Sequence, residues 1–136
     1  MRRGVVVWVT GLPSSGKSTL ARLAALLARQ GLVILVPASS HRRAYRQAAR
    51  RLAPRFLEVF VDVPLEECAR RDAKGLYALA RAGRAPNLPG AGAAYEPPLA
   101  PDVTARGGQD RLAIATILAR LEKGRTRSAL STVRAV

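Results

Sequence analysis

The sequence predicts a small α/β domain in which helices flank a parallel β-sheet. Two observations lead to this prediction: strand-like and helix-like segments alternate along the chain, and the strand-like segments are continuous apolar runs bounded by Gly or Pro. Unalternated β-branched runs are typical of strands that are buried on both faces of a parallel sheet. The alternation of such strands with helices therefore indicates the α/β class.

Three apolar runs are expected to form the main strands, and the first two are expected to be buried. The first run lies between Gly4 and Gly11, and the second ends at Pro37. A short fourth strand is expected near the C-terminal third of the chain. The expected strands span residues 5–9, 32–36, 56–62 and 101–104.

Segments rich in Ala, Leu and Arg favour helices between these strands. In the first helix four leucines share one face, and Gly31 is a natural C-terminal stop. Residues 83–101 are full of Gly, Pro and Ala, and a loop of this length is usually functional or disordered. The expected helices span residues 17–30, 42–52, 64–72, 74–82 and 113–121.

The length of 136 residues fits one domain, and a hydrophobic fraction of 49% can supply its core. No apolar run approaches the roughly 20 residues that a membrane span needs. The basic and apolar start is similar to a secretory signal, but Gly-Lys-Ser-Thr at residues 16–19 interrupts it before any cleavage site, so a cytoplasmic protein is expected. A single cysteine, Cys68, excludes an internal disulfide, and with a single histidine, His41, the chain has no Cys/His metal cage.

The charge is strongly basic, with 23 Lys and Arg residues against 9 Asp and Glu residues and a net charge of +14. A basic surface attracts phosphate-bearing ligands and nucleic acid. Aromatic residues make up only 4% of the chain, so bases would find few stacking platforms, and nucleic acid is not expected as the main partner. Five arginines of residues 42–52 are expected to form a solvated helix face, with anion binding as the alternative: Arg42, Arg43, Arg46, Arg50 and Arg51.

A phosphate-binding motif follows the first expected strand and opens the first expected helix. Its glycines allow the backbone to wrap around a phosphate, and successive N–H groups and the helix dipole then face the anion. Lys17 can neutralise β- and γ-phosphate oxygens of a bound nucleotide, and the Ser18 hydroxyl can ligate Mg²⁺. A plain Gly/Ser turn is the alternative. The motif reads Gly11-Leu12-Pro13-Ser14-Ser15-Gly16-Lys17-Ser18 and continues into Thr19.

A phosphotransferase also needs an acid for magnesium or for the acceptor hydroxyl. Residues 1–57 contain no Asp or Glu, so that acid must come from the second half of the chain. Asp62 is the best candidate because it ends an apolar strand. An equally good interpretation is that Asp62 caps a helix opened by Pro64.

Several blocks beyond the phosphate loop together resemble the adenylylsulfate kinase family. They occur in family order, and the block Arg71-Asp72-Ala73-Lys74-Gly75-Leu76-Tyr77, followed by Ala80-Arg81-Ala82-Gly83, is far more specific than the phosphate loop. The other blocks are residues 11–21, 56–68 and Tyr95-Glu96-Pro97-Pro98. The resemblance implies a P-loop kinase sheet and transfer of the γ-phosphate of ATP to the 3′-hydroxyl of adenosine 5′-phosphosulfate (APS), which gives PAPS.

The resemblance also implies roles for individual residues. Residues 11–19 would hold the ATP phosphates, and Arg71 would lie near the ATP base. Residues 74–100 would form a lid over APS, with Lys74, Gly75, Leu76, Tyr77 and Leu88 as substrate-binding residues. The serine of the family's Ile-Ser-Pro segment matches Ser39 as a catalytic residue, although the register could instead select Ser40. A residue of an ordinary polar loop or a helix cap is the alternative role for either serine.

The chain also departs from the family pattern. The family has a strand that ends in Asp-Gly-Asp, followed by an arginine-bearing helix, and here residues 27–31 lead straight into what resembles the family's next strand. The missing strand is expected at an edge, so the sheet should survive its loss, but the expected acid is lost with it. In addition, Leu88 stands where the family usually has Phe, and leucine cannot stack on a purine.

The predicted organisation is therefore a P-loop kinase-like domain over residues 1–123, reduced by one edge strand, and a flexible basic tail over residues 124–136. The favoured function is phosphoryl transfer from ATP to APS with Mg²⁺, at an activity reduced by the missing segment. A degenerate ATP-binding module without turnover and a basic nucleic-acid binder are the two alternatives. A homodimer is a candidate assembly.

Overall fold

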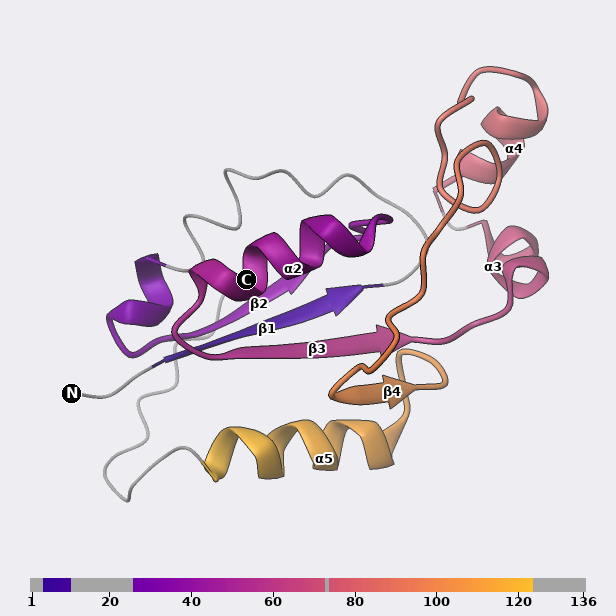
Figure 1. The fold of residues 1–136 in the computed structure, drawn as a ribbon. Helices are drawn as coiled ribbons and strands as arrows, with labels where there is room; N and C mark the ends of the chain where they lie inside the picture. The colour runs from indigo at the N-terminus through magenta and orange to yellow at the C-terminus, as the bar shows by residue number, and fades with distance from the viewer. Residues whose placement is uncertain (1–3, 11–25, 73, 124–136) are drawn as a thin grey trace.

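The computed structural model describes residues 4–10, 26–72 and 74–123 of the chain. In this part of the chain a parallel sheet of four strands, in the order β2-β1-β3-β4, lies between helices on its two faces (Figure 1). The predicted α/β class with a parallel sheet is confirmed. The strands span Val5–Thr10 (β1), Val33–Pro37 (β2), Phe56–Val61 (β3) and Val103–Ala105 (β4).

Helices cover the two faces of the sheet unequally. On one face lie α2 and the helical residues 26–29, and on the other face lies α5 (Figure 1). The helices α3 and α4 instead extend beyond the carboxyl ends of the strands. The helices span Arg43–Leu52 (α2), Leu65–Arg71 (α3), Leu76–Arg81 (α4) and Arg111–Glu122 (α5).

The central strand β1 supplies side chains to both cores. Successive side chains of a strand point to opposite faces. Accordingly, Val5 and Val7 pack on the face beneath α5, whereas Val6 and Trp8 pack beneath α2. All four are buried. A buried valine stabilises the fold by ~1.5–3 kcal/mol relative to an exposed one, so β1 contributes a large share of the folding free energy.

The prediction that the second strand is buried is wrong. Among the described strands, β2 is at the edge of the sheet, and Val33 and Leu35 are 45% and 65% exposed. Both side chains lie on the face that carries α5, but the buried residues in the α5 core come only from β1, β3, β4 and α5 itself. The opposite side of β2 is better covered, because Val36 packs with Ala28 and Ala49.

Most expected helices are confirmed, with shifted ends. The last helix begins two residues earlier than expected because Asp110 caps it: the Asp110 side chain accepts a hydrogen bond from the Ala113 amide at 3.0 Å. The fourth is shorter than expected and runs only over α4. Residues 26–29 are helical, and Gly31 ends them with a φ of 91°. The predictions for residues 11–25 and for the tail at 124–136 lie outside the described residues.

Among the described residues, no helix is both long enough and apolar enough to span a bilayer.

A tight approach of the chain at the start of β1 gives a stability prediction. Gly4 donates its amide hydrogen to the Ala28 carbonyl oxygen at 2.8 Å, and a Cβ at Gly4 would lie 2.1 Å from the Leu32 carbonyl oxygen. We expect Gly4→Ala to lower the free energy of unfolding by at least ~1–3 kcal/mol, because backbone atoms must move. Thermal or urea unfolding measures this change.

The matched control is Gly108→Ala. A Cβ at Gly108 meets no atom within 4 Å. We expect the control to change the free energy of unfolding by less than ~0.5 kcal/mol. Equal stability of the two variants would contradict the close packing of residues 4, 28 and 32.

Candidate active site

The candidate site lies at the edge of the sheet where the parallel strands end, here called the carboxyl edge. β1 ends at Thr10, directly before the phosphate-binding sequence, and pairs with β2 on one side and β3 on the other. Ligands of open α/β sheets bind at this edge. The segments that follow β2 and β3 therefore flank the point where β1 ends.

Ser39 and Ser40, here called the serine turn, lie beside the end of β1. The Thr10 hydroxyl donates a hydrogen bond to the Ser39 carbonyl oxygen at 2.5 Å. Both serines are buried, and the Ser39 hydroxyl has no hydrogen-bond partner among the described residues. Ser40 has a φ of 39°, a strained value for a residue with a side chain. Ser39, the serine predicted as catalytic, thus lies buried beside the end of β1, and its catalytic role stays a prediction.

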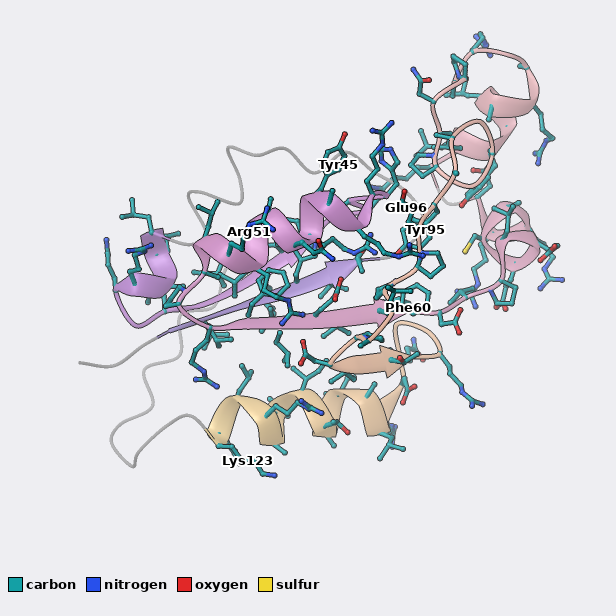
Figure 2. The ribbon with its side chains drawn as sticks, viewed as in Figure 1. Tyr45, Arg51, Phe60, Tyr95, Glu96 and Lys123 are labelled. Carbon is teal, nitrogen blue, oxygen red and sulfur yellow. The ribbon has the colours of Figure 1, made fainter. Side chains whose placement is uncertain are left out.

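Residues 95–97, here called the strap, cross the carboxyl edge from the far end of the expected lid. The Tyr95 hydroxyl lies 3.1 Å from the Thr10 hydroxyl, and the Tyr95 ring stacks on Phe60 with 6.2 Å between the ring centroids. Figure 2 shows Tyr95 above Phe60 and Glu96 near the beginning of α2, whereas Tyr45 points away from the sheet. Burial raises the pKa of the Tyr95 phenol above its ordinary value.

Hydrogen bonds of Glu96 attach the strap to the beginning of α2. The Glu96 carboxylate accepts a hydrogen bond from the Arg43 amide at 2.8 Å, and the Glu96 amide donates to the His41 carbonyl oxygen at 2.8 Å. A carboxylate at a helix N-terminus satisfies free N–H groups and interacts favourably with the helix dipole. The side chain of Glu96 thereby provides the N-terminal cap that Arg42, the residue at the cap position, does not supply.

Arg46 corrects the prediction of a fully solvated basic face on the second helix. Its side chain is only 2% exposed and donates hydrogen bonds to Glu58, to the Ser40 carbonyl oxygen and to the Glu96 carbonyl oxygen. The Arg46–Glu58 distance is 2.8 Å. The guanidinium also lies 5.8 Å from the centre of the Tyr95 ring. A buried charge needs such partners, and here they come from three separate segments.

Asp62 is exposed and follows β3 at the carboxyl edge. Its amide donates to the Ala105 carbonyl oxygen at 2.8 Å. The interpretation of Asp62 as a helix cap is wrong: α3 has Pro64 at its N-cap and no side-chain cap hydrogen bond. The Asp62 carboxylate therefore lacks the structural role that competed with a chemical one.

The other predicted site residues lie on α3, α4 and the following loop. Arg71 is exposed and forms an ion pair with Glu67, and Lys74 is also exposed.

Tyr77 is buried, and burial raises the pKa of its phenol. Gly75, with a φ of 66°, precedes α4, and Leu76 begins it; Leu88 is buried within the loop. The structure does not bring these residues into contact with the serine turn. Lys17 and the rest of residues 11–19 lie outside the described residues.

Magnesium would have to use few protein ligands at this site. Among the described residues no group of three His, Cys, Asp or Glu side chains could hold a metal ion. Magnesium bound to a nucleotide usually takes one or two carboxylates together with phosphates and water. The single exposed carboxylate of Asp62 at the carboxyl edge fits that mode of binding.

Sequence reasoning missed three residues of the site: Thr10, Glu58 and Arg46. The signal for the last two was present, because Glu58 is the one charged residue in the apolar run 56–61. A carboxylate in a buried strand requires a cationic partner. Arg46 and Ala49 are three positions apart and share the buried face of α2, which makes Arg46 the natural partner.

Comparisons with known proteins identify relatives of the chain. Residues 20–106 match the family model described as adenylylsulphate kinase. An adenylyl-sulfate kinase of Synechococcus sp. (strain JA-2-3B'a(2-13)) is 35% identical, with 82% of this chain and 89% of the relative covered. One of Chloroflexus aurantiacus is 36% identical, with 77% and 81% covered. A solved structure, the Mycobacterium tuberculosis APS kinase CysC in complex with AMPPNP and APS, is 32% identical with a TM-score of 0.76 and covers 90% of this chain and 99% of that chain.

The Synechococcus alignment also shows an internal deletion in this chain. It runs over 156 residues but takes in only 82% of this chain, which is about 112 of the 136 residues, so about 44 positions of the relative have no counterpart here. Gaps that total about 44 positions support the predicted loss of a strand and a helix.

The contact between the Tyr95 and Thr10 hydroxyls gives a prediction about how the free energy of unfolding depends on pH. A phenol whose pKa is raised by folding holds its proton longer in the folded state, so its contribution to stability is present below pH ~10 and is lost as the pH rises through the folded pKa. We expect Tyr95→Phe to lower the free energy of unfolding by about 1 kcal/mol at pH 7, through loss of the Thr10 contact. The stability loss at alkaline pH should also become shallower.

Urea unfolding of both proteins at a series of pH values measures this difference. Tyr45→Phe is the control, because Tyr45 is exposed and points away from the sheet (Figure 2). Alkaline slopes that are the same in wild type and Tyr95→Phe would contradict the burial of the phenol.

Proposed function

The chain belongs to the adenylylsulphate kinase family and is a kinase-type transferase, and we propose that it transfers the γ-phosphate of ATP to the 3′-hydroxyl of APS. The products are PAPS and ADP, and the proton of the hydroxyl goes to a base of the site or to water. The observation that carries the proposal is the family match over residues 20–106, which begins directly after the phosphate-binding sequence.

ATP would be held by the main-chain amides and side chains of residues 11–19. In this proposal Lys17 neutralises phosphate oxygens, Ser18 is a magnesium ligand and Arg71 lies near the base. Magnesium would supply charge stabilisation for the transferred phosphoryl group. The lid, residues 74–100, would close over APS with Lys74 and Leu88 among its contacts.

Asp62 would act as the acid that replaces the one lost with the missing segment. Its exposure at the carboxyl edge and its lack of a capping role support this assignment. Ser39, buried beside Thr10 with an unpartnered hydroxyl among the described residues, would contact the reacting groups. A positioned carboxylate typically contributes ~10²–10⁴-fold to the rate.

The activity is proposed to be strongly reduced, because the deletion removes about 44 positions and residues 1–57 contain no acid. A basic nucleic-acid binder stays the less favoured alternative, and a homodimer stays a candidate assembly. The cytoplasmic location and the domain limits at residues 1–123 stay predictions.

The first test is a coupled assay of ADP formation with ATP, Mg²⁺ and APS, run beside the Synechococcus relative. We expect APS-dependent turnover roughly 10²-fold or more below that of the relative, because the family's own acid and its arginine-bearing helix are lost and Asp62 only substitutes for the acid. Turnover equal to that of the relative would contradict the reduced activity. ATP binding without any APS-dependent turnover would instead favour the degenerate module.

The second test concerns the phosphate-binding lysine. Lys17→Ala should weaken the binding of AMPPNP at least ~10–100-fold, because a charge-assisted contact to phosphate is lost. Isothermal titration calorimetry measures the affinity. The matched control is Lys123→Ala, since Lys123 is exposed at the end of α5 (Figure 2) and should leave the affinity unchanged. Unchanged affinity in Lys17→Ala would refute the phosphate loop.

The third test concerns the proposed acid. Asp62→Asn keeps the shape of an exposed side chain, so the fold should be intact while kcat falls ~10²-fold or more. Glu66→Gln, a change of another exposed acid in the first turn of α3, is the control and should leave kcat unchanged. A kcat that is the same in Asp62→Asn and wild type would assign the acid to another residue.

A further inference from the structure

Arg46 joins three separate segments of the chain. The guanidinium Nε donates to the Glu58 carboxylate on β3 at 2.8 Å, one terminal nitrogen donates to the Ser40 carbonyl oxygen at 2.6 Å, and the other donates to the Glu96 carbonyl oxygen at 2.6 Å. Glu58 thus orients the guanidinium, while its two ends fix the serine turn and the strap. Only a planar group with several donors in fixed directions can make all three contacts.

The two segments fixed by Arg46 meet at the end of β1. The serine turn reaches Thr10 through the Ser39 carbonyl oxygen, and the strap reaches the same threonine through the Tyr95 hydroxyl. Thr10 directly precedes Gly11, the first glycine of the phosphate-binding sequence. The network therefore runs from a buried ion pair to Thr10, the residue directly before the phosphate-binding sequence.

The strap has few other attachments to α2. Beyond it, a cavity of about 320 Å³ lies between α2 and residues 98–102, and Leu99 is 81% exposed. The contacts with Arg46, with Arg43 and with the His41 carbonyl oxygen thus hold the trailing end of the expected lid to the body of the domain.

We propose that Arg46 is a positioning residue of the phosphotransfer site: it locks the strap and the serine turn against the end of β1, so that the lid closes over the acceptor in one register. The inference rests on the proposed function. It predicts that Arg46 governs binding and turnover of the acceptor and has little influence on the affinity for nucleotide.

Arg50 provides a matched control on the same helix. It pairs with the same carboxylate, at 3.5 Å, and with Asp102 at 3.3 Å, but it is 43% exposed and contacts neither the strap nor the serine turn. A change of Arg50 to lysine therefore perturbs the Glu58 cluster without loosening the two segments.

The test compares Arg46→Lys with Arg50→Lys in the full chain. Lysine keeps the charge beside Glu58, but its ammonium cannot reach Ser40 and Glu96 at once. In Arg46→Lys the Glu96 amide should exchange its hydrogen about tenfold faster or more, as expected when a hydrogen bond to a charged group is lost. The KM for APS should rise about tenfold, and kcat should fall about tenfold. The affinity for AMPPNP should stay within about twofold of the wild-type value.

The same measurements on Arg50→Lys should match wild type. A uniform rise in hydrogen exchange, with nucleotide and acceptor affinities falling together, would show a purely structural role and overturn the proposal. Unchanged exchange at Glu96 and unchanged KM would overturn it as well. If wild type neither binds nor turns over APS, the proposed function fails, whereas the exchange data still decide whether Arg46 holds the strap.

A second variant keeps the proposal falsifiable where Arg46→Lys fails to fold. Arg43→Ala changes a side chain near the surface that donates to the Pro97 carbonyl oxygen at 2.7 Å, so it loosens the strap without leaving a buried charge unpaired. We expect faster exchange of the Glu96 amide and a raised KM for APS, each by severalfold. Exchange and KM equal to those of wild type would count against the strap as an anchored element.

Discussion

The central position of β1 is the constraint on which the rest of the structure depends. Its parallel pairing with β2 and with β3 brings the ends of three strands to one edge. Parallel neighbours require the chain to return across the sheet between strands, so segments distant in sequence meet where the strands end. The serine turn follows β2 and Asp62 follows β3 at this edge for that reason, while the strap reaches the same edge from the segment before β4 through Tyr95 and Thr10.

The internal deletion affects the fold and the chemistry of the site differently: the sheet survives it, but the acid of the site is lost. β1 keeps a partner on each side, so both of its ladders are complete among the described strands, while the apolar side chains of Val33 and Leu35 on the edge strand β2 are exposed. Loss of an edge therefore costs burial and not topology. An acid at the carboxyl edge has no such redundancy, and in this chain only Asp62 follows β3 at that edge with its carboxylate exposed.

The sequence was sufficient to predict elements whose cause is local. The apolar run that begins at Val5 predicts β1 from its pattern. Residues 43–52 predict α2 because they are rich in residues with high helix propensity. The exposure of β2 could not be predicted in this way, because it depends on which helices reach its second face. The same holds for Arg46: five arginines on one helix look alike in sequence, and only the docking of α2 on β3 selects which of them is buried.

The buried pair of Arg46 and Glu58 contributes geometry more than stability. Removing two charges from water costs about as much as their attraction returns, so apolar residues of similar volume could fill the same space at equal stability. Apolar residues could not, however, satisfy the Ser40 and Glu96 carbonyl oxygens, which each accept a hydrogen bond from the guanidinium. By donating to both oxygens, the guanidinium fixes the distance between the serine turn and the strap across the end of β1.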